Sequence, residues 1–212
     1  MTSVKICGLS TPGAVSAGVD GKAAYLGFIF FPKSPRNVAP ETAVRLADPA
    51  RGKAKIVAVM VDPDDEQVTR ITRTLRPDLI QLHGTESPNR AAAIAALAGR
   101  PIIKALPVSE ASDVDAAGAY DGLVEHLMFD ARPPKGADLP GGMGSSFDWT
   151  ILAGRRFQRP HFLAGGLDPW NVGEAIGQSG APLVDVSSGV ERGPGLKDPG
   201  LISAFLDAVR RV

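Results

Sequence analysis

Eight short apolar runs recur along the chain, and segments with a helical pattern separate them. Several runs are almost continuously apolar, which is typical of strands that are buried on both faces. The runs cover residues 4–7, 25–31, 56–61, 79–82, 102–106, 126–129, 162–164 and 183–186. Strands that alternate with helices predict a parallel sheet, and eight is the number of strands that closes an α/β barrel.

The segments between the runs carry signals for helix starts. Thr11 before Pro12 reads as an N-cap followed by the first helical residue, and Ser87 before Pro88 repeats the pattern. Asp64 and Asp65 precede apolar residues with helical spacing at positions 68, 71 and 75. A further helical pattern spans 170–176, and Pro199 opens a last helix with a predicted apolar face at 201, 204, 205 and 208.

Two architectures fit alternating strands and helices, and the position of the glycine-rich turns separates them. An open doubly wound sheet usually carries a G-x-G-x-x-G phosphate loop after its first strand. Here the first run ends in Cys7-Gly8-Leu9-Ser10, and the phosphate-like turns come last. We therefore expect a single (β/α)8 TIM barrel. No linker or shift in composition divides the chain, so residues 1–212 are predicted to form one catalytic domain.

The last two runs end in small residues, Gly165-Gly166 after the seventh and Ser187-Ser188-Gly189 after the eighth. Glycine lets the backbone approach a ligand closely, and free N–H groups at a following helix start attract anions. Adjacent turns after strands seven and eight are where such barrels hold phosphate. The alternative interpretation is two ordinary turns with convenient glycines.

Composition and charge exclude several classes of function. The 23 basic and 23 acidic residues balance, so we expect no nucleic-acid partner. A single cysteine, Cys7, fits a reducing compartment, and no apolar run is long enough for a signal peptide or a membrane span, so we expect a cytoplasmic protein without membrane contact. The three histidines lack metal-ligand spacing, and no metal site is expected.

In a barrel the chemistry lies at the carboxyl ends of the strands, which selects a short list of side chains. Cys7 is a candidate base or nucleophile if it ionises, and otherwise a buried structural cysteine. Asp130 is a candidate general acid, or else a capping residue of its loop. Asp185 lies in an apolar strand and needs a polar partner. Its alternating position directs it into the barrel mouth, and the alternative is a structural hydrogen bond to a neighbouring strand end.

Cations and one histidine complete the list. Arg36 follows two prolines that stiffen its loop, so it is either a bidentate clamp for a carboxylate or an exposed loop charge. His83 is a candidate proton carrier, hydrogen-bond donor or cap. Lys104 is a weak candidate for a Schiff base, whereas Lys33 and Lys197 are expected to be solvated.

The strand ends and their turns carry a series of motifs: VKICGL at 4–9, GFIF with PKSPR at 27–36, LIQLHG at 79–84, FD at 129–130, GGMG and FDW at 141–149, LAGGL at 163–167, and VDVSSGVE with PG and KD at 184–198. Taken together and in order, these motifs resemble the phosphoribosylanthranilate isomerase family over nearly the whole chain. Two positions depart from the family pattern: Met143, where threonine is common, and Ser10, which keeps the hydroxyl.

The resemblance implies an Amadori rearrangement of N-(5-phosphoribosyl)anthranilate in tryptophan biosynthesis, without a cofactor. By resemblance, the catalytic pair is Asp130 as general acid and Cys7 as general base. The substrate-binding residues implied are Arg36, His83, Asp185, Gly165, Gly166, Ser187, Ser188 and Gly189. The implied partner is a small phosphoribosyl substrate, and a monomer or a homodimer is expected.

Two rival interpretations remain. One is a barrel isomerase that acts on a phosphoribosyl-aminoimidazole substrate of histidine synthesis. Such enzymes typically use two aspartates and two phosphate grips, whereas this chain has Cys7 at the end of its first run and one predicted grip. The other is a phosphosugar-binding barrel without catalysis, for which Met143 is the sequence hint.

Overall fold

The eight apolar runs form the eight parallel strands of a closed barrel in the computed structural model, which describes residues 2–132, 136, 141, 142 and 144–212. The strands are β1 (Ser3–Cys7), β2 (Tyr25–Phe30), β3 (Lys55–Met60), β4 (Leu79–Leu82), β5 (Ile102–Val108), β6 (His126–Ala131), β7 (Phe162–Leu163) and β8 (Leu183–Val186). Each strand pairs with the next one along the chain, and β8 returns to β1. The predicted TIM barrel is confirmed, and the open sheet is excluded.

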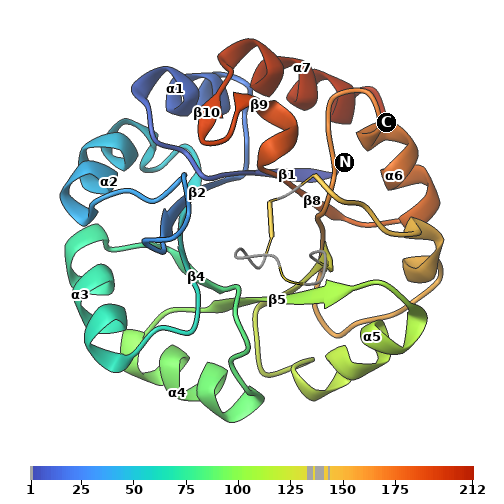
Figure 1. The fold of residues 1–212 in the computed structure, drawn as a ribbon, viewed down its shortest axis with the longest axis horizontal. Coiled ribbons are helices and arrows are strands. Elements are labelled where there is room, and N and C mark those ends of the chain that lie inside the picture. Colours follow the sequence, from blue (N-terminus) through green and yellow to red (C-terminus); the bar gives the residue numbers. More distant parts are fainter. Residues whose placement is uncertain (1, 133–135, 137–140, 143) are drawn as a thin grey trace.

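Helices surround the barrel, as the view down its axis shows (Figure 1). They are α1 (Pro12–Asp20), α2 (Pro40–Ala47), α3 (Asp65–Leu75), α4 (Pro88–Ala98), α5 (Ala111–Asp115), α6 (Val172–Ser179) and α7 (Pro199–Arg210). Short 3₁₀ helices supplement them at Asp48–Ala50, Ala116–Ala119, Trp149–Leu152 and Ser188–Val190. The 3₁₀ helix Trp149–Leu152 lies between β6 and β7 in the chain.

The predicted helix starts are confirmed by their caps. The side chains of Thr11, Asp64 and Ser87 each accept a hydrogen bond from a backbone N–H in the first turn of the helix that follows. Each cap satisfies a donor that the helix itself leaves free. The stretch 170–176 is only partly helical, because α6 begins at Val172 and Trp170 lies exposed before it.

The predicted apolar face of the last helix is wrong in part. Residues 205 and 208 are buried, but 201 and 204 are only partly so, and the face instead centres on Ile202, Phe205, Leu206 and Val209. The helix has apolar residues around most of its circumference, so spacing alone does not tell which of them face the barrel. Packing against β1 and α1 decides it.

Apolar side chains form two separate layers, one on each side of the barrel wall. The larger layer fills the space between strands and helices, and Phe28, Phe129 and Phe205 are its bulkiest buried members. The smaller layer fills the barrel interior and includes Tyr25, Met128 and Phe162. Because side chains alternate along a strand, each strand contributes to both layers. Cys7 belongs to the interior layer, so its side chain points into the barrel.

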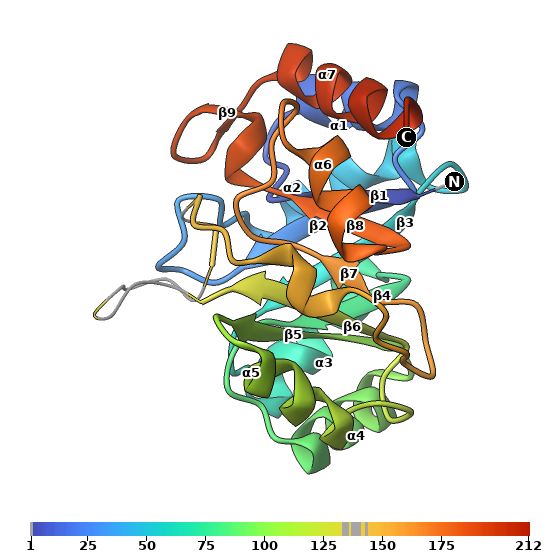
Figure 2. The same cartoon turned by 90° about the vertical axis from the view of Figure 1, so that its right-hand side faces the viewer.

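One further sheet lies outside the barrel. After β8 the chain forms a small antiparallel hairpin of β9 (Glu191–Gly193) and β10 (Leu196–Lys197). Figure 2 shows this hairpin at the end of the barrel opposite the two termini. That end carries the carboxyl ends of the strands, where the site described next is found.

Candidate active site

A pocket with about 830 Å³ of empty space, part of it open to solvent, lies at the carboxyl ends of the strands. Nine of the ten residues that the sequence selected line it: Cys7, Arg36, His83, Asp130, Gly165, Gly166, Asp185, Ser187 and Ser188. The tenth, Gly189, is not among the lining residues, and a Cβ there would overlap the carbonyl oxygen of Leu167. Met143 lies outside the described residues. With Val59 and Val61 from β3 and its end, residues from seven of the eight strand ends or their loops line this opening.

Cys7 lies at the end of β1 and is almost completely buried. Burial raises the pKa of the Cys7 thiol, and the nearby ammonium of Lys5 opposes that rise. Lys5 Nζ is 2.8 Å from Asp185 Oδ1, its register partner on β8. Asp185 thus has the strand-end partner that the sequence left open as one alternative, although its side chain also reaches the pocket.

Asp130 lies within β6, one residue before the strand ends. Its Oδ2 is 3.0 Å from Nε2 of His83, and Nδ1 of His83 is 2.9 Å from the side-chain nitrogen of Gln81. Since an amide nitrogen only donates, Nδ1 is the acceptor of that pair and the neutral imidazole carries its proton on Nε2. A chain from Gln81 through His83 thus delivers a hydrogen bond to the carboxylate of Asp130. Sequence reasoning did not single out Gln81.

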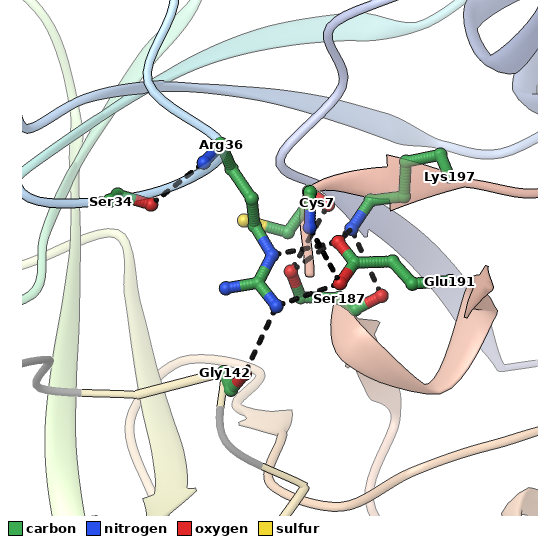
Figure 3. Close-up of polar contacts among 8 residues, drawn as sticks. Cys7, Ser34, Arg36, Gly142, Ser187, Glu191 and Lys197 are labelled. Atoms are coloured by element: carbon green, nitrogen blue, oxygen red, sulfur yellow. Dashed lines mark hydrogen bonds and ion pairs between the residues drawn. The ribbon is translucent and has the colours of Figure 1, made fainter. Parts of the chain in front are cut away.

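Arg36 is buried and paired with a carboxylate (Figure 3), so the interpretation of an exposed loop charge is wrong. Its Nε donates to Glu191 Oε1 at 2.7 Å and its Nη2 to Glu191 Oε2 at 2.9 Å. Nη2 also donates to the carbonyl oxygen of Gly142 at 3.1 Å. The two nitrogens of Arg36 that face Glu191, Nε and Nη2, are therefore both hydrogen-bonded. Nη1 lies toward Gly142, which lines the pocket.

The prediction that Lys197 is solvated is wrong, whereas Lys33 is exposed as predicted. The Lys197 ammonium forms an ion pair with Glu191 and donates to the carbonyl oxygen and the hydroxyl of Ser187, at 3.0 and 3.2 Å. These partners offset the cost of burying the charge. Burial lowers the pKa of Lys197, and the charge of Glu191 limits that decrease. Glu191 therefore joins the hairpin to Arg36, and Lys197 joins it to the turn after β8.

Lys104 is also buried, but it lies outside the barrel interior. Its neighbours Ile103 and Ala105 belong to the interior layer, so its own side chain points toward the helices. The ammonium donates to Glu86 Oε2 at 2.6 Å and to the carbonyl oxygen of Gly84 at 2.7 Å. Lys104 thus stabilises the turn after β4. Because its side chain lies away from the pocket, Lys104 is excluded as a Schiff-base candidate.

The turns after β7 and β8 form the wall of the pocket next to Cys7. Gly165 has φ of +86°, and a Cβ there would lie 2.4 Å from the backbone nitrogen of Ala131, so only glycine fits. Among the described residues, no hydrogen bond uses the backbone N–H of Gly166 or Ser188. Ser188 opens a short 3₁₀ helix, where such groups are free to bind an anion.

A family model described as N-(5'phosphoribosyl)anthranilate (PRA) isomerase matches residues 4–208. The chain belongs to the PRA isomerase family. Among curated relatives, the N-(5'-phosphoribosyl)anthranilate isomerase of Caulobacter vibrioides is 69% identical over 208 residues, covering 98% of this chain and 95% of that one. The one of Sinorhizobium fredii is 52% identical and covers 98% and 93%.

Solved structures of PRA isomerases have the same architecture. The phosphoribosyl anthranilate isomerase of Thermotoga maritima superposes with a TM-score of 0.89 at 33% identity over the full length of both chains. A second PRA isomerase structure, in complex with reduced 1-(o-carboxyphenylamino)-1-deoxyribulose 5-phosphate, superposes with a TM-score of 0.86 at 32% identity, again over both full chains.

No group of three or more His, Cys, Asp or Glu side chains is arranged to hold a metal ion in the part of the chain that the structure describes. None of the described helices combines the length and the apolar character that crossing a membrane requires.

Proposed function

We propose that the protein converts N-(5'-phosphoribosyl)anthranilate into 1-(2-carboxyphenylamino)-1-deoxyribulose 5-phosphate, an isomerisation in tryptophan biosynthesis. Membership of the PRA isomerase family over residues 4–208 carries this proposal. The pocket supports it, because one opening holds a thiol, a carboxyl group, an arginine and two glycine- or serine-rich turns. We also propose that residues 1–212 act as one catalytic domain, in the cytoplasm, as a monomer or a homodimer.

The reaction begins with proton transfer from Asp130 to the ring oxygen of the ribose. The bond between that oxygen and C1 breaks as the substrate nitrogen donates its electron pair, which leaves an iminium ion. The thiolate of Cys7 then removes the proton from C2, and the electrons of that C–H bond flow to the nitrogen. The resulting enolamine tautomerises to the ketone. Each step moves a proton or an electron pair within the substrate, so an acid and a base suffice.

The anionic groups of the substrate have separate grips in the pocket. Arg36, held through Nε and Nη2 by Glu191, offers its pocket-side Nη1 to the anthranilate carboxylate. Backbone N–H groups of Gly165, Gly166, Ser188 and Gly189, together with the hydroxyls of Ser187 and Ser188, bind the phosphate. Asp185 accepts a hydrogen bond from a sugar hydroxyl through Oδ2, since Oδ1 is taken by Lys5. Binding at both ends positions the sugar between acid and base.

A steady-state assay with freshly made N-(5-phosphoribosyl)anthranilate, followed by the loss of its fluorescence, tests the proposal. We expect turnover by the wild type and a loss of about 10³-fold in kcat for Cys7→Ala. The reduced product analogue should still bind to the variant in calorimetry, because the anion grips are intact.

Three outcomes would contradict parts of the proposal. Near-normal turnover by Cys7→Ala would remove Cys7 from the mechanism and keep the reaction. Turnover of a phosphoribosyl-aminoimidazole substrate in its place would favour the histidine-pathway isomerase. Tight binding of the analogue without any turnover by the wild type would favour a non-catalytic phosphosugar-binding barrel.

A further inference from the structure

Lys5 is a fully buried lysine inside the barrel, and the proposed reaction gives it no role. It precedes Cys7 by two residues on β1, so the two side chains point to the same face of the strand. A buried ammonium is costly unless it is paired. The pairing here is with Asp185 Oδ1 at 2.8 Å, across the contact between β1 and β8.

The space above Gly27 shows how close the head groups of Lys5 and Cys7 are. Gly27 on β2 is the register partner of Cys7. A Cβ built on Gly27 would lie 3.2 Å from the Sγ of Cys7 and 3.2 Å from the Nζ of Lys5. Because Gly27 has no side chain, the thiol and the ammonium face the same space. The Sγ of Cys7 and the Nζ of Lys5 are therefore separated by at most twice 3.2 Å. An opposite charge at this range favours the ionised form of a group.

Because Cys7 is buried, its thiol needs a nearby positive charge if it is to ionise and act as a base. Burial raises the pKa of Cys7, and the charge of Asp185 adds to this increase. The charges that oppose it are those of Lys5, the larger, and of Lys197 on β10. Arg36, His83 and Asp130 also line the pocket.

Lys5 itself stays charged in this environment. Burial favours its neutral form, but the charges of Asp185 and Cys7 outweigh burial and raise the pKa of Lys5. The ammonium is therefore a permanent positive charge at physiological pH, and Asp185 holds it in place below the thiol.

We propose that Lys5 is a positioning residue that stabilises the thiolate of Cys7, with Asp185 as the anchor of its ammonium. This proposal rests on the proposed function, in which Cys7 is the base. The thiol releases its proton to solvent, the ammonium balances the negative charge left on sulfur, and the thiolate then accepts the proton from C2 of the substrate. Lys5 transfers no proton.

The single cysteine of the chain makes a direct test practical. The thiolate of Cys7 is titrated by its absorbance at 240 nm, with Cys7→Ala as the blank at each pH, and its alkylation by iodoacetamide is followed in parallel. We expect the midpoint to rise by about one pH unit or more in Lys5→Met. Alkylation at pH 8 should then slow about tenfold, because only the thiolate reacts.

Lys104→Met is the matched control. It removes a second fully buried lysine from a carboxylate partner, but on the helix side of the barrel wall. The titration midpoint of Cys7 should stay at the wild-type value in this variant. An equal shift in Lys104→Met would mean that the loss of any buried lysine disturbs the site, which overturns the specific role of Lys5.

A second variant covers the case in which Lys5→Met leaves Asp185 unpaired and fails to fold. Lys5→Met/Asp185→Asn removes both charges and leaves no buried carboxylate without a partner. Its midpoint should still lie above the wild-type value, by less than in Lys5→Met, because Lys5 has the larger influence on the thiol. A midpoint that stays constant or falls in folded Lys5→Met or in the folded double variant would overturn the proposal.

The titration also separates this proposal from the proposed function. In Lys5→Met, the rise of kcat/KM with pH should shift upward together with the thiolate titration. If the thiolate shifts but Cys7→Ala keeps full activity, the coupling of Lys5 to Cys7 stands and the assignment of Cys7 as base fails. If kcat/KM shifts without the thiolate, the role of Lys5 proposed here is wrong.

Discussion

Two polar clusters meet at the mouth of the barrel, and they are built in different ways. The base cluster comprises Lys5, Cys7 and Asp185 on β1 and β8, and the acid cluster comprises Gln81, His83 and Asp130 on β4 and β6 and in the turn after β4. The base cluster contains a fixed positive charge, and the side chains of Lys5 and Asp185 are 0% and 8% exposed. The acid cluster is a chain of hydrogen bonds, and the side chains of His83 and Asp130 are 17% and 10% exposed.

The difference follows from what each cluster has to do. A buried thiol becomes a base only if a nearby charge compensates its ionisation, and a lysine held by an aspartate supplies that charge permanently. A general acid must instead lose and regain a proton in each cycle, which requires a partner that can exchange hydrogen bonds near water. One barrel thus keeps two environments at opposite sides of one pocket.

The largest expected effect comes from removing Asp130, the proposed general acid. Asp130→Ala should lower kcat by about 10³-fold, because no other carboxyl group of the acid cluster can reach the ring oxygen. Affinity for the reduced product analogue, measured by calorimetry, should change little. Near-normal turnover would assign the proton donor to another group.

The next effect tests whether the acid cluster works as a chain. His83→Leu removes the hydrogen bond to Asp130, and we expect kcat to fall about 10- to 100-fold with a change in the shape of its pH profile. Gln81→Met removes only the group that fixes the tautomer of His83, so its effect should be smaller. Equal losses in the two variants would indicate that both act through the packing of the barrel.

A third prediction concerns a histidine outside the acid cluster. His161 packs against Phe129 and Phe157, and burial lowers its pKa to about 4. The unfolded chain therefore binds more protons than the folded one between about pH 6.5 and pH 4. Stability is fully present above that window and is lost as the pH falls through it.

Urea unfolding at two pH values measures this effect. From pH 7 to pH 5, His161 should cost the wild type about 2 kcal/mol of unfolding free energy that His161→Phe does not lose. The same pH dependence in both proteins would exclude His161 as the cause. The variant also provides a background for studying His83, since one buried histidine no longer titrates.

The smallest effect is expected at the carboxylate grip. Glu191→Gln keeps the shape of the side chain but removes the charge that holds Arg36, so KM should rise about five- to tenfold with kcat changed less than twofold. Glu174→Gln, an exposed position on α6, is the control and should leave both constants unchanged. A fall in kcat without a change in KM would place Glu191 closer to the chemistry than to binding.

The sequence predicts the strands well because each is a buried apolar run. The predicted bounds of β4 and β8 coincide with the observed ones, and residues after these two runs reach the pocket. The partners of those residues are harder to predict. Arg36 and Glu191 are 155 positions apart, and no local pattern indicates that the guanidinium and the carboxylate meet.

The three buried lysines show the limits most clearly. Lys5 shares a strand face with Cys7, so an inward-facing thiol already implies an inward-facing ammonium, and this signal was available in the sequence. The residues around Lys104 are apolar on both faces of its strand, so the sequence does not show which face of the strand carries Lys104. The burial of Lys197 depends on a hairpin that only the fold reveals.

The contact between β1 and β8 also determines when the site can form. It joins the first strand to a strand about 180 positions later, and the pair of Lys5 and Asp185 bridges it. Contacts of such long range are expensive in chain entropy and tend to form late in folding. The thiol of Cys7 therefore acquires its neighbouring charges only when the barrel closes. Partly folded forms that lack β8 hold a cysteine without its anchored ammonium, so a change in the pH at which the thiol of Cys7 titrates would report barrel closure during refolding.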